Sequence, residues 1–163
     1  MIRLLVNPLA QPADALAVGA RWTSGTLTIG EDEIVRFAML TGDWFPIHTD
    51  RHAAAASPEG VRTAQGYLTL AIAAALLRPD PPGALIALRR LGRTRWIAPV
   101  PLGATLGVEL EVAAVTVEGP CGGVATVRSD VRVLIAPERA VLVTELVTLQ
   151  RCAAVVDRCD PTA

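Results

Sequence analysis

The sequence predicts an α+β fold in which a curved antiparallel sheet wraps around one long buried helix. Residues 64–78 favour a helix and are apolar on nearly every face, and a soluble protein buries such a helix on all sides. Residues 84–151 are predicted to form strands in which apolar and polar residues alternate, so the sheet has one apolar face to cover. Wrapping the sheet around the helix satisfies both requirements with a single core.

The first third of the chain is predicted to contribute one strand and one amphipathic helix. Residues 1–17 are interpreted as an irregular lead-in and residues 20–28 as a strand. Gly30 is the expected N-cap of a helix that runs to about Leu40, because three acidic residues follow it and suit the positive end of the helix dipole. The third of them, Glu33, is placed to reach back to the cap.

The second half of the chain is predicted to be all strand. Alternation is clean over residues 105–112 and slips by one position at Ala113-Ala114, which indicates a β-bulge. The chain shows no repeat, so residues 1–163 are interpreted as a single domain with a C-terminal tail at 153–163. The predicted strands are 84–88, 92–99, 105–117, 124–135 and 140–151.

The composition excludes several classes of function. The net charge is −1 and the 15 basic residues, all arginine, are scattered, which argues against a nucleic-acid surface. The absence of lysine excludes Schiff-base chemistry on a lysine and a Walker-type phosphate site. The three cysteines, Cys121, Cys152 and Cys159, form no CxxC pair and have no neighbouring histidine, so no metal site is expected.

The apolar segments are too short for a membrane protein or a secreted precursor. No run approaches the ~18–20 apolar residues that cross a bilayer. The apolar N-terminal stretch is interrupted by Asn7 and Pro8, which leaves no signal-peptide core. We therefore expect a soluble, cytoplasmic protein.

Residues 41–50 are the strongest candidate for a catalytic site. They place Asp43 and His48 five residues apart and separate them with apolar side chains. Such a loop predicts a partly dry pocket in which an acid and a base act on one water molecule. The alternative for His48 is a structural hydrogen bond to a loop carbonyl, and for Asp43 it is capping of the turn after the helix. The apolar residues between them are Trp44, Phe45 and Ile47.

A short helix is predicted from Arg51 to Ala56, directly after this loop. Asp50 is its expected N-cap. His52 lies on this helix without a carboxylate at useful spacing, so it is interpreted as a surface residue.

Three ordered segments resemble the MaoC-like dehydratases, a family with the hot-dog fold that includes the (R)-specific enoyl-CoA hydratases. The first is Phe-Ala-Met-Leu-Thr-Gly-Asp-Trp-Phe-Pro-Ile-His-Thr-Asp at 37–50. The second is Ala-Gln-Gly-Tyr-Leu-Thr-Leu at 64–70, and the third is Pro-Val-Pro-Leu-Gly-Ala-Thr-Leu at 99–106. Their order and spacing make the resemblance far more specific than any one of them alone.

The resemblance implies a hydro-lyase that hydrates enoyl thioesters and dehydrates 3-hydroxyacyl thioesters. It implies that Asp43 and His48 are the catalytic pair and that the Gly66 amide is the oxyanion donor, with Gln65 beside it. The substrate is carried on coenzyme A or the phosphopantetheine of an acyl carrier protein, and no other cofactor or metal is implied. The family's paired hot dogs imply a homodimer or higher homo-oligomer for a single repeat. The candidate acyl-pocket residues are Trp44, Phe45 and Tyr67.

Three positions depart from the family pattern and favour a non-catalytic alternative, and a second alternative stays open beside it. Phe45 stands where many members have asparagine, Gln65 where many have histidine, and Ala71 where some have serine. One alternative is a non-catalytic acyl-thioester-binding subunit of a heteromeric hydratase. The other is a hot-dog thioesterase, which hydrolyses the thioester.

One local basic cluster has two interpretations. It contains Arg89, Arg90, Arg93 and Arg95 on a predicted strand. It is either a solvated strand edge or an anchor for the phosphates of the carrier, for which Arg93 and Arg95 are the candidates.

Overall fold

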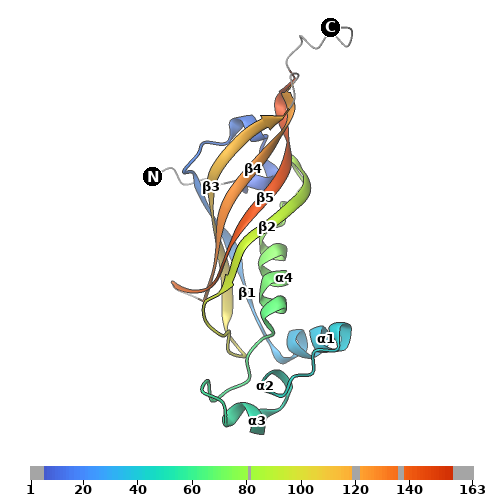
Figure 1. Ribbon diagram of the computed structural model, residues 1–163, viewed down its shortest axis with the longest axis vertical. Helices are drawn as coiled ribbons and strands as arrows, with labels where there is room; N and C mark the ends of the chain where they lie inside the picture. The colour runs from blue at the N-terminus through green and yellow to red at the C-terminus, as the bar shows by residue number, and fades with distance from the viewer. Residues whose placement is uncertain (1–5, 81, 119–121, 136–137, 156–163) are drawn as a thin grey trace.

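The computed structural model describes residues 6–80, 82–118, 122–135 and 138–155 of the chain. Within them, five antiparallel strands form one curved sheet in the order β1-β3-β4-β5-β2, and helix α4 (Gly66–Leu77) lies along one face of it (Figure 1). This arrangement confirms the predicted α+β fold. The strands are β1 (Arg21–Thr28), β2 (Leu85–Trp96), β3 (Thr105–Glu118), β4 (Gly122–Ile135) and β5 (Arg139–Val155).

Three helices follow β1 and gather at one end of the sheet (Figure 1): α1 (Glu31–Thr41), α2 (Pro46–Thr49) and α3 (Arg51–Ala55). The predicted cap of α1 is confirmed, since the Gly30 N–H donates to Glu33 Oε2 at 2.7 Å. Asp50 caps α3 as expected, because its carboxylate accepts hydrogen bonds from two backbone N–H groups of that helix. The one-turn helix α2 was not predicted.

The two ends of the described chain lie together at the other end of the sheet. The lead-in forms two single-turn 3-10 helices, η1 (Pro8–Ala10) and η2 (Ala13–Ala15), and the Ala153 N–H donates to the Asp14 carboxylate at 2.8 Å. The predicted tail 153–163 begins too early, because β5 continues to pair with β4 as far as Val155. The rest of that tail, with Cys159, and also Cys121 lie outside the described residues.

Helix α4 is buried on one side only, so the prediction of burial on all sides is wrong for the single chain. Its inward residues belong to the core together with the inward residues of β3, β4 and β5. On the opposite side Tyr67 is 69% exposed, and three alanines beside it are also exposed. This side is exposed because the five strands wrap only part of the way around α4. The buried residues of α4 are Leu68, Thr69, Ile72, Ala73 and Leu77.

Strand β2 replaces two strands that the sequence predicted separately, at 84–88 and 92–99. It is continuous from Leu85 to Trp96 and pairs with β5, but its register shifts at three places. Each shift changes the phase of the apolar pattern, which is why the alternation does not reveal one strand. The bulge predicted in 105–117 is confirmed, since the register of β3 against β4 shifts between Val112 and Ala114.

Among the residues that the structure describes, no helix is long and apolar enough to cross a membrane.

Candidate active site

The loop that carries Asp43 begins at a left-handed glycine. Gly42 has φ 78°, a conformation that costs little only for glycine, and its N–H donates to the Ala38 carbonyl at 2.8 Å. This ends α1 sharply and turns the chain toward the start of α4. Asp43 is the next residue and lies half-buried.

His48 is fixed by a short hydrogen bond from its ring to the backbone. It lies in α2, which begins at Pro46, where proline presets the helical φ. Its Nδ1 lies 2.7 Å from the Thr63 carbonyl oxygen. A carbonyl only accepts, so Nδ1 must carry the proton, and neutral His48 presents an unprotonated Nε2. The ring therefore has the tautomer that a general base requires.

The Thr63 carbonyl is itself held in place by its neighbours. The Thr63 N–H donates to the Ile47 carbonyl at 3.2 Å, and the Ala64 N–H donates to the Val100 carbonyl at 2.8 Å. Thr63 also forms an isolated bridge with Pro101. The acceptor for His48 is thus clamped between α2 and the segment that links β2 to β3.

The Asp43 carboxylate, in contrast, is not tied to other protein groups. Within the described part of the chain it has no hydrogen-bond or ion-pair partner, and no bond joins it to His48. Only the backbone of Asp43 is held: its N–H donates to Thr41 Oγ1 at 3.3 Å, and its carbonyl accepts from Gln65 Nε2 at 3.4 Å. The carboxylate is therefore available to a ligand or a water molecule.

Gln65 connects this loop to the start of α4. Its side chain is 1% exposed, and its Nε2 donates to the carbonyls of Ile34 in α1, at 3.2 Å, and of Asp43. Its Oε1 is buried without a partner among the described residues. The structure thus places Gln65 behind the site as a link between three segments and not on the wall of the pocket.

The first turn of α4 presents free backbone amides. No side chain caps this helix, and its first internal bond runs from the Thr69 N–H to the Gln65 carbonyl. The amides of residues 66–68 therefore have no acceptor inside the helix, and they lie at the positive end of the helix dipole. An anionic oxygen placed here would be stabilised.

A pocket of about 350 Å³ joins His48 to the start of α4. Gly66 forms part of its wall, and a Cβ at this position would come within 2.8 Å of Trp96 Nε1. The Thr69 hydroxyl lies one turn further into the helix and donates to the Gln65 carbonyl at 3.3 Å. The lining residues are Ile47, His48, Thr63, Ala64, Gly66, Thr69, Trp96, Ile97, Ala98, Pro99 and Val100.

A second hollow of about 380 Å³ lies elsewhere, on strands β1, β3 and β4. Most of its charged side chains are paired with one another: Arg21 with Glu111 at 2.7 Å and Arg132 with Glu109 at 3.0 Å. It contains no histidine. We therefore place the chemistry in the pocket beside His48, although the outer hollow is slightly larger.

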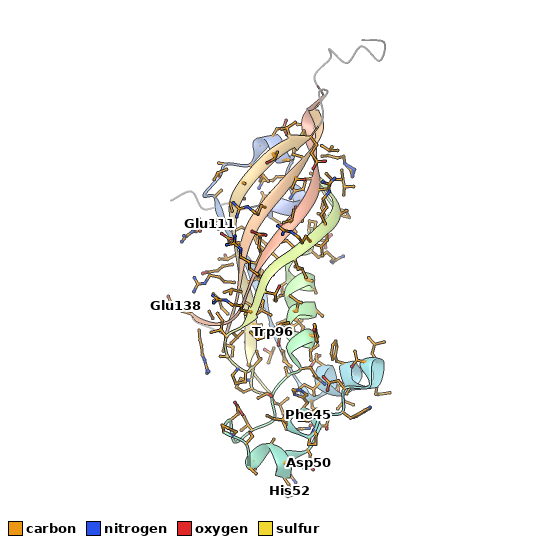
Figure 2. The ribbon with its side chains drawn as sticks, viewed as in Figure 1. Phe45, Asp50, His52, Trp96, Glu111 and Glu138 are labelled. Carbon is orange, nitrogen blue, oxygen red and sulfur yellow. The ribbon has the colours of Figure 1, made fainter. Side chains whose placement is uncertain are left out.

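Asp43 and the remaining predicted site residues are not among the residues that line the pocket. Trp44, Phe45 and Tyr67 are exposed, and Phe45 packs its ring at a tilt 6.3 Å from that of His48. Arg93 and Arg95 are exposed, without an ion pair among the described residues. In Figure 2 the labelled His52 lies at the far tip of the helical end, away from Trp96 at the end of β2.

Sequence reasoning missed Trp96, Thr63 and Thr69 as lining residues. Thr69 follows Gly66 by three residues, a spacing that puts both on one side of a helix, so its position was available from the sequence. Thr63 acts through its carbonyl, which carries no sequence signal. Trp96 faces the pocket because of a β-bulge that the sequence did not reveal.

Comparison with known proteins places this geometry in a family. A family model described as "MaoC like domain" matches residues 17–131. Protein MaoC of Klebsiella aerogenes is 37% identical over 108 residues, which are 66% of this chain and 30% of that protein. A 3-hydroxybutyryl-CoA dehydratase of Methylorubrum extorquens is 39% identical over 87 residues, 52% of this chain and 54% of that one. The chain thus spans about half, or less, of the length of these curated relatives.

Solved structures show the same fold. R-Hydratase PhaJ1 from Pseudomonas aeruginosa superposes with a TM-score of 0.67 at 29% identity, covering 86% of this chain and 85% of that chain. A Mycobacterium tuberculosis protein described as a double hotdog fold has a TM-score of 0.74 at 16% identity, covering 88% and 45%, and this likeness shows the fold alone. The sheet and helix described above are therefore a hot-dog fold, and the chain belongs to the MaoC-like domain family.

Proposed function

We propose that this protein is a hydro-lyase that hydrates enoyl thioesters and dehydrates 3-hydroxyacyl thioesters. One observation carries the proposal: His48 holds its Nδ1 on the Thr63 carbonyl, at 2.7 Å, and lines the same pocket as Gly66 at the start of α4. A base and an anion-stabilising helix end thus face one cavity. Relatives named 3-hydroxybutyryl-CoA dehydratase and R-hydratase support this reaction class.

The proposed reaction uses one water molecule and two side chains. His48 Nε2 and the free Asp43 carboxyl group hold the water between them. One group takes a proton from the water as the hydroxyl joins the β-carbon, and the other delivers a proton to the α-carbon. Dehydration is the reverse. Because every transferred group comes from the chain or from water, the reaction as proposed requires no metal ion or cofactor beyond the carrier of the acyl group.

The thioester oxygen gains negative charge as the β-carbon is attacked. The Gly66 amide is proposed to donate to that oxygen, because it is free of intrahelical bonds and lies at the positive end of α4. Glycine is required here because a Cβ would come within 2.8 Å of Trp96 Nε1, which packs over this residue. Gln65 then has a positioning role, since its amide group fixes the Asp43 backbone relative to this helix end.

Arg93 and Arg95 are proposed as the anchor for the carrier phosphates. Both guanidinium groups are exposed and unpaired within the described residues, and both lie on the strand that leads to the pocket. Arg93→Met and Arg95→Met should raise KM for crotonyl-CoA several-fold and leave kcat unchanged. The same variants should not affect the crotonyl thioester of N-acetylcysteamine, which has no phosphate. Equal effects on both substrates, or no effect on either, would show that the two arginines lie on a solvated strand edge and do not bind the carrier.

A homodimer is proposed to form along β2. This edge strand is twelve residues long and exposes Ile86, Leu88 and Leu91, and the exposed Tyr67 of α4 packs against Trp96 at its end. A long apolar edge favours pairing with another strand, and a second copy offers an identical one. Light scattering should give twice the chain mass. Leu88→Asp should reduce it to the mass of one chain, whereas Val117→Asp, at an exposed position of β3, should not.

The reaction class is tested with crotonyl-CoA. We expect loss of the ultraviolet absorbance of the conjugated thioester, without release of a free thiol. Thiol release detected with a thiol reagent would indicate the thioesterase instead. Binding of butyryl-CoA without turnover of enoyl-CoAs from four to ten carbons would indicate a non-catalytic subunit.

A further inference from the structure

We propose that Thr69 is a positioning residue, whose hydroxyl aims and polarises the amide that stabilises charge on the thioester oxygen. The hydroxyl donates to the Gln65 carbonyl at 3.3 Å. That carbonyl and the Gly66 N–H are the two ends of one peptide unit, so Thr69 acts on the donor through the backbone. This inference rests on the proposed function, since the Gly66 amide is the proposed oxyanion donor.

The peptide unit between Gln65 and Gly66 is held at its carbonyl end by one residue. The Thr69 N–H donates to the Gln65 oxygen at 3.1 Å, and the Thr69 hydroxyl donates to the same oxygen. A peptide unit is planar and trans, so its C=O and N–H bonds point in opposite directions. Two donors that fix the oxygen therefore also fix the direction in which the Gly66 hydrogen points.

The second donor also strengthens the amide. A carbonyl that accepts hydrogen bonds is polarised, and the N–H of its own peptide unit becomes a better donor, by about 10–30% for each bond in such a chain. The bond from the Thr69 N–H is of the kind that any α-helix makes, whereas the bond from the hydroxyl depends on the side chain. The hydroxyl is therefore the part of this arrangement that a substitution can remove.

Stability alone does not account for threonine at position 69. Of the five buried residues of α4, Thr69 is the one with a polar side chain, and it is 1% exposed. Valine has nearly the same shape and would pack there without burying a hydroxyl. A hydroxyl that bonds back to the preceding turn slightly destabilises a helix. The place of the hydroxyl points to the site instead, because Thr69 lines the same pocket as His48 and Gly66.

The hydroxyl is not itself a catalytic group. It has one proton, and it donates that proton to the Gln65 carbonyl. The following peptide unit, which carries the Tyr67 N–H, is held by a different element, because Trp96 Nε1 in β2 donates to the Gly66 carbonyl at 2.9 Å. Side chains thus orient two consecutive amides at the start of α4, and Thr69 orients the one that is proposed to contact the substrate.

Thr69→Val and Thr69→Ser test this role with crotonyl-CoA. Valine removes the hydroxyl but leaves the backbone N–H of residue 69 on the Gln65 carbonyl, so the melting temperature should stay close to that of the wild type. The kcat should fall about tenfold and KM should stay within about twofold, because the amide acts mainly on the charged transition state. Serine keeps the hydroxyl and should restore kcat to within about threefold of the wild type.

Thr148→Val is the matched control. It removes another buried threonine hydroxyl that donates to a backbone carbonyl, that of Val127 in β4 at 3.4 Å. Thr148 is not among the residues that line the pocket. The control should therefore leave kcat unchanged, even if it lowers the melting temperature.

The infrared spectrum of a bound saturated thioester separates the role of Thr69 from the proposed reaction. Butyryl-CoA with an isotope-labelled thioester carbonyl cannot be hydrated, and hydrogen bonds to this carbonyl lower its stretching frequency. Binding to the wild type should lower the frequency, Thr69→Val should lose about half of that shift, and Thr69→Ser should keep it. If the shift depends on the hydroxyl but crotonyl-CoA is not hydrated, the proposed reaction fails and the role of Thr69 stands.

Three results would overturn the role of Thr69. The first is a folded Thr69→Val that leaves the frequency of the bound carbonyl unchanged or, with an active wild type, hydrates crotonyl-CoA at the wild-type rate. The second is a Thr69→Ser no more active than Thr69→Val. The third is a wild type that does not shift the carbonyl of butyryl-CoA, because the start of α4 then contacts no thioester oxygen. Should Thr69→Val not fold, Thr69→Ala must show the same losses.

Discussion

The imidazole of His48 and the carbonyl of Thr63 are separated by only 2.7 Å, and this contact sets the chemistry of the ring. It joins two segments fifteen residues apart and leaves Nε2 as the only acceptor of the neutral side chain. Since the bond is to the backbone, it depends on how the segment before α4 is folded. The contact therefore has two roles: it links two segments of the fold, and it fixes the tautomer of His48. Substitutions can separate the structural role from the chemical one.

His48→Asn is predicted to keep the structural role of this contact and to remove the chemical one. The asparagine amide nitrogen occupies a place similar to that of Nδ1 and can still donate to the Thr63 carbonyl, but no basic nitrogen replaces Nε2. The melting temperature should stay close to that of the wild type, while kcat falls by about 10²–10⁴. His48→Ala should lose the tie as well and melt earlier. Wild-type turnover by His48→Asn would exclude the ring as the base.

Gly66→Ala should disturb the pocket through Trp96. The added Cβ would come within 2.8 Å of the indole nitrogen, so the ring or the helix end must shift, at a cost of about 1–3 kcal/mol in unfolding free energy. Urea unfolding measures this loss. The matched control is Gly25→Ala, where the Cβ meets nothing within 4 Å. Stability should return in Gly66→Ala combined with Trp96→Ala, and a purely additive result would contradict the clash.

Gln65→Met should lower activity more than stability. Methionine has nearly the same length but loses the donor that holds the Asp43 carbonyl. It removes the unpartnered buried Oε1 but also leaves the buried carbonyl of Ile34 without its donor, so we expect a net loss of about 1 kcal/mol in unfolding free energy. A misplaced Asp43 should reduce kcat about tenfold or more. If kcat is unchanged, or falls only as the protein unfolds, Gln65 does not position the loop.

The Glu31–Arg62 ion pair should make stability sensitive to acid. A hydrogen bond and the charge of Arg62, at 3.1 Å, lower the pKa of Glu31 below its ordinary value of 4.5. Because the folded pKa is the lower one, the stabilisation is complete above about pH 4.5 and is lost as the pH falls through the folded pKa. Glu31→Gln should therefore be less stable than the wild type at pH 7 and equal to it at pH 2.

The Arg62→Gln background provides the control for this pair. Without the guanidinium, most of the pH-dependent effect of Glu31→Gln on urea unfolding should disappear, because only the weaker charge of Arg51 still lowers the pKa of Glu31. A difference of undiminished size in this background would assign the effect to the N-terminus of α1 instead, where Glu31 also lies.

Much of this fold could be predicted because local rules and the tertiary structure agree. The acidic first turn after Gly30 and the alternation over 105–117 both follow directly from side-chain chemistry, and the structure has the helix and the bulged strand there. The course of β2 could not be predicted, since its bulges hide the alternation. The exposed side of α4 was missed because an alanine-rich helix looks the same whether or not a sheet covers it.

The candidate site was predictable only in part. Asp43 and His48 stand out as ionisable groups in an apolar loop, and Gly66 stands at the start of a helix. The residues that orient them act through backbone carbonyls, as at Thr63, or through a register shift, as at Trp96. Neither effect has a signature in residue type, so the structure was needed to find them.

The most direct test of the account is the rate of crotonyl-CoA hydration by Asp43→Asn and His48→Asn. Asp43→Asn preserves the shape of the side chain and His48→Asn keeps a donor for the Thr63 carbonyl, so neither should change the melting temperature much. The account predicts that each reduces kcat by at least a hundredfold while butyryl-CoA still binds. Hydration at the wild-type rate by both folded variants would contradict it.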